Sequence, residues 1–203
     1  MKEVVKQVIL SHKRAKKVDT TKTIAGCSIC VPEAQADEYR EYNPDVDIIV
    51  HPDSVIGLTP KIRWVYEQFK NVIMFDDDLN AMRRTFVDKE FDEGFQIKDP
   101  ELARDIVQST AFTAREAGCV FFGFSNSARP LDYNPMKPVK FSGYGVGGSH
   151  GFLDGYKMVI PDSVIAGQDY FLSATNAHFH RKAYINTRYA FTSKDGTLSP
   201  REV

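Results

Sequence analysis

The amino-acid sequence predicts an α/β fold, a single domain in which a mostly parallel central sheet is flanked by helices. In the first half, short apolar runs alternate with helix-prone segments through short connections, as in parallel sheets with helices on both faces. The apolar runs are continuous rather than alternating, which is typical of strands that are buried on both faces. A chain of 203 residues can also bury one substantial core without disulfides.

Four apolar runs in the first half are the expected strands: Val8–Leu10, Thr23–Val31, Val46–Val50 and Val72–Phe75. A polar, helix-prone segment, Glu33–Tyr42, follows the second run and ends at Asn43-Pro44. Another helix is expected before the fourth run, with Thr59 as its N-cap and Pro60 at its first helical position. In parallel sheets ligands bind at the carboxyl ends of the strands, so the polar residues there are candidate site residues.

The second half has a different pattern. Asp99-Pro100 begins an amphipathic helix that should run to about Arg115, and Ser125–Pro138 is expected to be a loop. A second helix is expected from Asp162 to about Ala177. The apolar, strand-like segments of this half are Cys119–Phe124, Val139–Tyr144, Lys157–Ile160 and Tyr184–Phe191.

Charge and hydropathy exclude two classes of protein. Lys and Arg number 26 and Asp and Glu 27, so the net charge is −1, and nucleic acid cannot be held mainly by an overall basic excess. No apolar run approaches the roughly 20 residues of a membrane helix. The N-terminus lacks a small-residue cleavage site, so no signal peptide is expected.

Cys27 and Cys30 form a C-x-x-C motif inside TIAGCSICV, which is typical of a buried strand. We therefore expect two small core residues, with a zinc site or redox chemistry as the alternative. Together with the missing leader, this predicts a reduced, cytoplasmic protein.

Three aspartates, Asp76, Asp77 and Asp78, directly follow the apolar run VIMF. Like charges at a strand end repel one another, and a divalent cation with its preference for carboxylate oxygens would compensate them. Alternate residues of an extended segment point the same way, so Asp76 and Asp78 can converge on one ion while Asp77 faces elsewhere. The alternative is a solvated acidic turn.

Several segments, taken in order, resemble the GT-A family of nucleotide-sugar glycosyltransferases, which have a Rossmann-like domain. They are SHKRAKKVDT, VPEAQADEYREY, GLTPKIRWVYEQF, VIMFDDDL with its D-x-D motif, and AGQDYFLSA. The resemblance extends over roughly Val8 to Phe191. The chain is also similar to small virus-borne members that glycosylate hydroxymethylated pyrimidines in DNA, which would act in the host cytoplasm. The near-neutral charge weighs against such a DNA acceptor.

The resemblance implies a metal-dependent transferase whose donor is a nucleotide-sugar, with a UDP-sugar expected. Asp76 and Asp78 would hold Mn²⁺ or Mg²⁺ against the donor diphosphate, and Asp77 would contact the ribose. The remaining donor-binding residues would be Ser11, His12 and Arg14 in the nucleotide pocket, and Lys61 and Arg63 at the base, ribose or phosphates. Residues 1–98 would form the nucleotide-sugar-binding half and residues 99–203 the acceptor-side half.

Asp169 matches the late acidic motif of the family and would be the general base of an inverting enzyme; the alternative is a carboxylate on a helix surface. Gly147 and Gly148 would form a wall of the sugar or acceptor pocket, or else a flexible turn, and His150 could hydrogen-bond the sugar. His178 or His180 is a candidate third metal ligand, and the alternative is a cation favoured by the helix dipole.

Two other functions are compatible with the pattern. A nucleotidyltransferase shares the α/β sheet and the metal-binding acids, but it would have a glycine-rich loop after the first strand, and SHKRAKKVDT contains no glycine. The other is a non-enzymatic α/β binding module in which the aspartates form a surface acidic patch.

Overall fold

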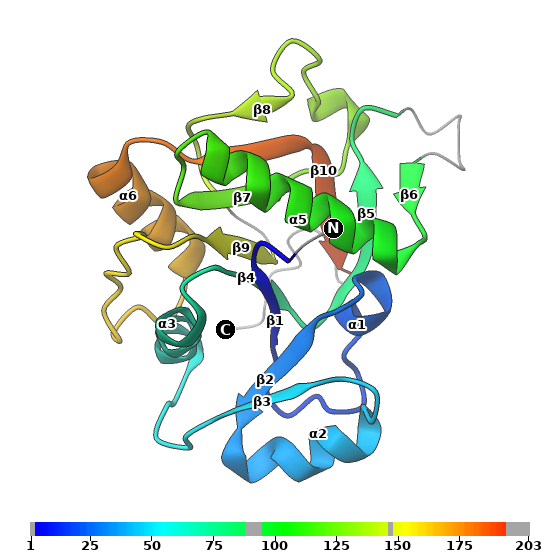
Figure 1. Cartoon of the computed structure of the whole chain (residues 1–203), viewed down its shortest axis with the longest axis vertical. Helices are drawn as coiled ribbons and strands as arrows, with labels where there is room; N and C mark the ends of the chain where they lie inside the picture. The colour runs from blue at the N-terminus through cyan, green and yellow to red at the C-terminus, as the bar shows by residue number, and fades with distance from the viewer. Residues whose placement is uncertain (1–2, 88–94, 146–147, 194–203) are drawn as a thin grey trace.

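The computed structural model describes residues 3–87, 95–145 and 148–193. These residues form one ten-stranded sheet in the order β3-β2-β1-β4-β9-β7-β10-β5-β6, with β8 paired to β10 (Figure 1). The strands are β1 Lys6–Leu10, β2 Ser28–Pro32, β3 Ile48–His51, β4 Val72–Asp76, β5 Leu79–Arg84, β6 Gln96–Ile97, β7 Phe121–Ser125, β8 Val139–Lys140, β9 Ser149–Phe152 and β10 Tyr184–Ser193. The predicted α/β class is confirmed.

The four strands β3, β2, β1 and β4 are parallel neighbours and correspond to the four apolar runs of the first half. Leu10 lies opposite Cys30 on one side and Asp76 on the other, so the chain leaves these strands at one common edge. This carboxyl edge carries Ser11, His51 and the acid triplet. The fold therefore brings together side chains from three separate stretches of sequence.

Beyond β4 the sheet becomes mixed. The strand β9 is inserted antiparallel between β4 and β7, with Met74 opposite His150. The strand β10 runs parallel to β7 and antiparallel to β5. The glycine-rich segment was predicted as a pocket wall or turn and not as a strand, since glycine is disfavoured in strands. Here Gly151 fits because the ring of Phe122 occupies the place where a side chain would project.

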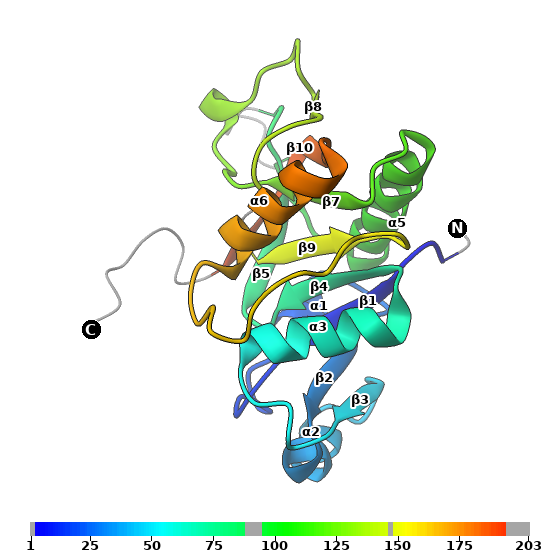
Figure 2. The same ribbon diagram turned by 90° about the vertical axis from the view of Figure 1, so that its left-hand side faces the viewer.

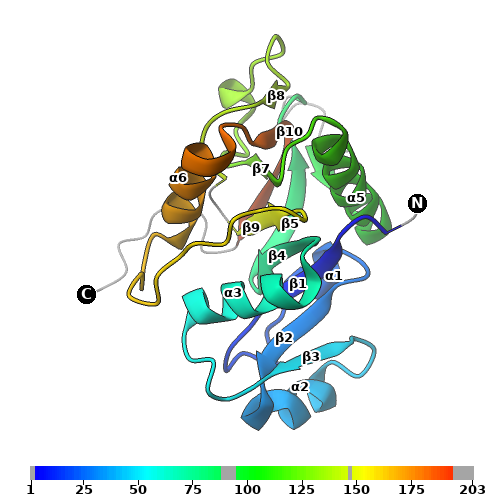
Figure 3. The same cartoon turned by 60° about the vertical axis from the view of Figure 1, so that its left-hand side comes forward.

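Helices cover both faces of the sheet (Figure 3). They are α1 Thr20–Thr23, α2 Ala36–Tyr42, α3 Leu58–Phe69, α5 Pro100–Glu116 and α6 Gln168–His180, with 3₁₀ turns at Glu33–Gln35 and Pro130–Asp132. Alternate residues of β1 serve the two faces: Ile9 packs in the core with α1, α2 and α5, and Val8 packs in the core with α3 and α6. No described helix has both the length and the apolar content needed to cross a bilayer.

The helix starts were predicted with mixed success. Asp99 caps α5 as expected, because its side chain accepts a 2.9 Å hydrogen bond from Glu101 N. Thr59 is not the N-cap of α3, which begins at Leu58 after Gly57. The Thr59 hydroxyl instead donates a 2.5 Å hydrogen bond to Val164 O, a distant partner that no local rule could supply. The helix α6 begins at Gln168, later than predicted.

Two strand predictions were too long and one was wrong. The expected strand Thr23–Val31 begins only at Ser28, because Thr23 ends the helix α1. Of Val139–Tyr144 only the first two residues are a strand, and Lys157–Ile160 is irregular. In Figure 2 the loop that contains β8 lies at the upper end of the molecule, above α6 and β9.

The cysteine prediction is confirmed. Cys27, Cys30 and Cys119 are buried free thiols. Burial raises the pKa of the Cys27 and Cys30 thiols to about 12, so neither carries a thiolate at neutral pH. The two residues of the C-x-x-C motif act as small core side chains.

Candidate active site

The acid triplet after β4 is tied to the loop after β1 through its middle member. Asp77 is buried, and its carboxylate accepts a 2.5 Å hydrogen bond from Ser11 Oγ and a 2.8 Å hydrogen bond from Arg14 Nη1. Tyr39 Oη lies 2.6 Å from Ser11 Oγ and accepts a hydrogen bond from Arg14 N. Burial raises the pKa of Asp77, and the bonds from Ser11 and Arg14 oppose that shift. The predicted contact of Asp77 with a ribose remains a prediction.

The outer members of the triplet are more exposed than Asp77. Asp76 is exposed, and its backbone N–H donates a 3.0 Å hydrogen bond to Gly148 O of the segment before β9. Asp78 is partly exposed, with Oδ2 4.0 Å from Arg14 Nη1. A Cβ atom on Gly148 would lie 2.6 Å from Leu79 Cδ2 and 3.1 Å from Asp76 Oδ2, so glycine permits the close approach of these side chains. Within the described ranges, no three His, Cys, Asp or Glu side chains gather as a metal site.

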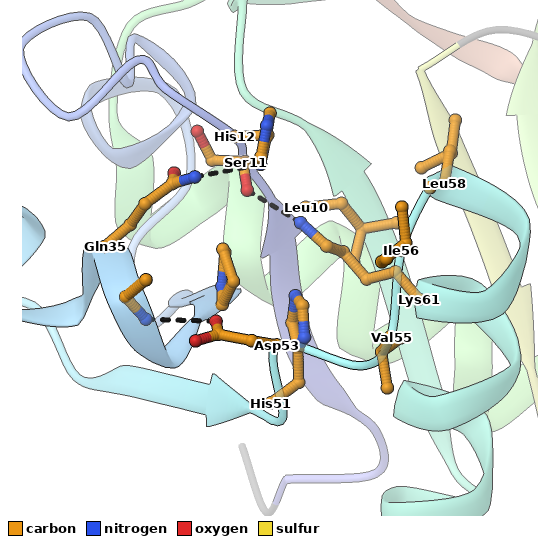
Figure 4. Close-up of a pocket in the computed structure, with 13 residues that line it drawn as sticks. Leu10, Ser11, His12, Gln35, His51, Asp53, Val55, Ile56, Leu58 and Lys61 are labelled. Atoms are coloured by element: carbon orange, nitrogen blue, oxygen red, sulfur yellow. Dashed lines mark hydrogen bonds between the residues drawn. The ribbon is translucent and has the colours of Figure 1, made fainter.

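A cavity of about 520 Å³ opens at the carboxyl ends of β1, β2 and β3 (Figure 4). We call it the Lys61 cavity. Its walls are mostly apolar, with a few polar groups pointing inward. The lining residues are Leu10, Ser11, His12, Pro32, Ala34, Gln35, His51, Asp53, Val55, Ile56, Gly57, Leu58 and Lys61.

Lys61 and His51 are buried side chains that can carry a positive charge, and both line the Lys61 cavity. Lys61 Nζ donates a 2.8 Å hydrogen bond to Ser11 O, and burial lowers the pKa of this amine. His51 Nδ1 lies 3.0 Å from Pro52 O, while its Nε2 has no hydrogen-bond partner among the described residues. Burial also lowers the pKa of His51, which favours the neutral imidazole. An apolar slot with such groups suits a planar ring that carries polar edges.

A second cavity, of about 320 Å³, lies next to the first. We call it the Asp169 cavity. Asp76 at the end of β4 and Asp169 at the start of α6 both line it, and Leu10 and Leu58 line both cavities. The lining residues are Leu10, Leu58, Ile62, Met74, Phe75, Asp76, Gly148, His150, Phe152, Gln168, Asp169 and Leu172.

His150 and Asp169 approach this cavity from different elements. His150 lies on β9, and its Nε2 has no partner within the described part of the chain. Burial lowers the pKa of His150, and the charge of Asp169 opposes that shift. Asp169 Oδ1 accepts a 2.9 Å hydrogen bond from Tyr170 N, and a carboxylate in the first turn is favoured by the helix dipole.

Six of the predicted site residues line neither cavity: Arg14, Arg63, Asp77, Asp78, His178 and His180. Arg63 donates hydrogen bonds to Ile160 O and to Asp162 Oδ1, the latter 2.8 Å long. His178 and His180 lie at the far end of α6, roughly 14 Å or more along the helix from Asp169 at about 1.5 Å per residue.

His180 is already engaged there, because its Nε2 accepts a 3.0 Å hydrogen bond from Lys157 N. Of the other predicted residues, Ser11, His12 and Lys61 line the Lys61 cavity, and Gly148 and His150 line the Asp169 cavity. Gly147 lies outside the described residues.

Sequence reasoning did not single out His51, Gln35 or Asp53 as site residues, although all three line the Lys61 cavity. His12 and Gln35 approach to 3.1 Å, and Asp53 Oδ1 accepts a hydrogen bond from Ala34 N (Figure 4). The available signal was position, since His51 ends a parallel strand and Asp53 follows it. Position at the end of a parallel strand indicates the edge of the sheet where ligands bind, but it does not show which residues at that edge contact a ligand.

Comparison with known proteins identifies the family of the chain. Residues 5–139 match the model of a family described as TET-Associated Glycosyltransferase, which is more than half of the 203 residues. The match includes the acid triplet and every residue that lines the Lys61 cavity, and it ends before His150 and Asp169. No curated protein matches the chain.

Proposed function

The chain belongs to the TET-associated glycosyltransferase family, and we propose that it is a GT-A type enzyme that uses a divalent cation to transfer a sugar from a UDP-sugar to a hydroxyl on a modified DNA base. Membership of a glycosyltransferase family favours glycosyl transfer over the nucleotidyl transfer and the non-enzymatic binding module considered from sequence. The donor, the cation and the acceptor are the parts that need argument.

One observation carries the proposal. Asp76 and Asp169 come from distant parts of the chain, yet both line one cavity, which shares Leu10 and Leu58 with the larger Lys61 cavity. An extended donor can therefore lie across the two leucines. Its nucleoside would occupy the Lys61 cavity, and its sugar would occupy the Asp169 cavity.

The diphosphate of such a donor would lie near the acid triplet. Asp76 and Asp78 are the residues that would hold Mn²⁺ or Mg²⁺, since carboxylate oxygens suit these hard cations and both side chains are at least partly exposed. A bound cation supplies positive charge to the departing nucleoside diphosphate. Arg14, anchored on Asp77, and the buried Lys61 amine add fixed positive groups to the same edge.

In the proposed reaction, Asp169 acts on the acceptor. As the new bond forms between the acceptor oxygen and the anomeric carbon, the bond from that carbon to the diphosphate oxygen breaks. The leaving diphosphate keeps the electron pair, and Asp169 takes the proton from the acceptor hydroxyl. His150, neutral because it is buried, would hydrogen-bond a sugar hydroxyl through Nε2.

The acceptor proposal has its support in the family, whose name associates it with TET, and in the resemblance to enzymes that glycosylate hydroxymethylated pyrimidines. A base must leave the helical stack before an enzyme can act on its substituents. The acceptor would thus be a single nucleotide presented to the mouth of the Asp169 cavity.

Donor and cation are tested together by thermal unfolding and by donor turnover. We expect UDP with Mn²⁺ to raise the unfolding temperature, and UDP alone to raise it much less. A panel of nucleotide-sugars with Mn²⁺ should then reveal slow hydrolysis of the true donor. A chain that no nucleotide and metal pair stabilises, and that hydrolyses no nucleotide-sugar, would contradict the proposal.

The general base is tested by Asp169→Asn. Transfer should fall by about 100-fold or more, since general-base catalysis contributes roughly that much, while UDP–Mn²⁺ binding is retained. The matched control is Asp154→Asn, at an exposed aspartate that lines neither cavity. Transfer that survives in Asp169→Asn would show that another group takes the proton.

A further inference from the structure

Two exposed tyrosines stand beside Asp169. Tyr170 follows Asp169 directly, and its ring centroid lies 5.5 Å from that of Tyr144, with the rings inclined at 65°. The two residues are 58% and 59% exposed. Neither lines the Lys61 cavity or the Asp169 cavity, so the proposed donor does not account for them.

Hydrogen bonds hold this tyrosine pair next to the first turn of α6, which carries Asp169. Gly145, the neighbour of Tyr144, donates a 3.0 Å hydrogen bond from its N–H to Ser173 Oγ. The Ser173 hydroxyl in turn donates a 2.8 Å hydrogen bond to Asp169 O. A Cβ atom on Gly145 would lie 2.7 Å from the Phe121 ring, so glycine permits this close approach. Tyr144 and Tyr170 are thus both anchored to the first turn of α6.

We propose that Tyr144 and Tyr170 form the acceptor platform, on which the base of a nucleic-acid strand stacks with its hydroxyl directed at Asp169. This inference rests on the proposed function and adds the surface that holds the acceptor. Stacking between a base and an aromatic ring is sequence-tolerant and strong, because every base has a π-face. Two inclined rings offer a face and an edge to one planar group.

Charge on the neighbouring segment fits a nucleic acid. Residues 126–144 lead from β7 through β8 to Tyr144 and carry Arg129, Lys137 and Lys140, all exposed, against the single acid Asp132. The whole chain has a net charge of −1, so this local excess of cations is a departure from the average. Cations beside a stacking surface are how proteins follow the phosphates of a single strand.

The same segment exposes apolar side chains. Leu131 and Met136 are 87% and 86% exposed, and Phe141 is about half exposed. Apolar side chains of this kind separate stacked bases in proteins that kink or open DNA. The segment therefore combines phosphate-binding cations with groups able to hold a base out of its stack.

The experiment uses the full chain and a fluorescein-labelled single-stranded DNA oligonucleotide that contains one 5-hydroxymethylcytosine. Fluorescence anisotropy gives its Kd for the wild type, for Tyr144→Ala and Tyr170→Ala, and for the conservative Tyr144→Phe and Tyr170→Phe. We expect the alanine variants to bind about tenfold more weakly and the phenylalanine variants about as well as the wild type. Phe112→Ala, at an exposed aromatic on the distant α5, is the matched control.

Two further readouts separate a platform from a merely structural role. The thermal shift with UDP and Mn²⁺ should be unchanged in all variants, which shows that the fold and the donor site are intact. Once transfer is measurable, the KM for the oligonucleotide should rise in the alanine variants, while slow donor hydrolysis without acceptor stays as in the wild type.

Each outcome decides the inference. Alanine variants that bind the oligonucleotide as tightly as the wild type would overturn it. So would a wild type that hydrolyses the donor but does not bind the oligonucleotide, or one that transfers to a saccharide in a tyrosine-dependent way; the proposed glycosyl transfer would stand in both cases. Tyrosine-dependent oligonucleotide binding without any donor hydrolysis would support the platform and contradict the proposed function.

Discussion

Arg14 donates a 2.8 Å hydrogen bond to Asp77, joining the basic loop after β1 to the acid triplet after β4. The two groups come from the most basic and the most acidic stretches of the chain, and the parallel pairing of β1 with β4 places them side by side. The central acid thereby holds the edge together, while its two neighbours are more exposed and Asp78 lies 4.0 Å from the same arginine.

Asp77→Ala should destabilise the protein. Ser11 and Arg14 would lose their shared acceptor, and we expect the free energy of unfolding to fall by about 1–3 kcal/mol, discounted because Arg14 is partly exposed. Urea denaturation measures the change. Asp78→Ala is the control, since Asp78 lies 4.0 Å from Arg14 and should cost less than about 1 kcal/mol. Equal losses in both variants would contradict the special position of Asp77.

Lys61 and Arg63 lie two residues apart on α3 but should differ in function. Lys61→Met removes a buried amine from the Lys61 cavity, so the Kd for UDP with Mn²⁺ should rise by about tenfold. Arg63→Met removes hydrogen bonds to Ile160 and Asp162 and should leave nucleotide affinity within about twofold. Isothermal titration calorimetry distinguishes the two. A larger loss of affinity in Arg63→Met would show that the donor reaches the other side of the helix.

Gly148→Ala should obstruct the Asp169 cavity. The added Cβ would lie 2.6 Å from Leu79 Cδ2 and 3.1 Å from Asp76 Oδ2, so we expect about 1–3 kcal/mol of destabilisation and a marked loss of donor hydrolysis. Gly123→Ala on β7 is the control, because its nearest neighbour would be 3.7 Å away. Hydrolysis as fast in Gly148→Ala as in Gly123→Ala would mean that the donor does not pass this point.

The buried His51 should make stability depend on pH. Its pKa in the folded protein is lowered by burial below the ordinary value of 6.5, so below that pH the unfolded chain binds a proton more readily than the folded one. The stability contributed by neutral His51 is complete above pH 6.5 and is lost as the pH falls through the folded pKa.

We expect the free energy of unfolding to decrease as the pH is lowered below 6.5. Each histidine with a lowered pKa contributes at most about 1.4 kcal/mol per pH unit to this decrease. Burial is the main cause of the lowered pKa of His51, and the charges of Lys61, Asp53 and His12 have smaller effects on it. His51→Gln cannot titrate, so its stability should fall less steeply on acidification in urea titrations. Identical slopes for the variant and the wild type would show that His51 contributes nothing to the pH dependence.

The parallel half of the fold was predictable because the patterns that indicate its strands lie within short stretches of sequence. Continuous apolar runs mark buried strands, and parallel strands deliver their carboxyl ends to one edge, which located Ser11 and the acid triplet. Asp169 was chosen from a resemblance, and the structure brings it to one cavity with Asp76. Their catalytic roles remain predictions.

The features that could not be predicted from the sequence depend on tertiary contacts. The strand β9 forms in a glycine-rich segment because β4 and β7 pair with it on both sides and Phe122 covers Gly151. Thr59 is drawn away from capping by Val164, more than a hundred residues further along the chain. Lys61 and Arg63 looked equivalent by type and spacing, but a helix turns about 100° per residue, so only Lys61 faces the cavity.

The wall shared by the two cavities has a kinetic consequence. Leu10 and Leu58 line both spaces, so a nucleoside seated in the larger one covers part of the boundary of the smaller one. The acceptor then meets a complete site only after the donor has arrived. Initial-rate measurements should therefore follow a compulsory order, with the nucleotide-sugar entering first and the nucleoside diphosphate leaving last.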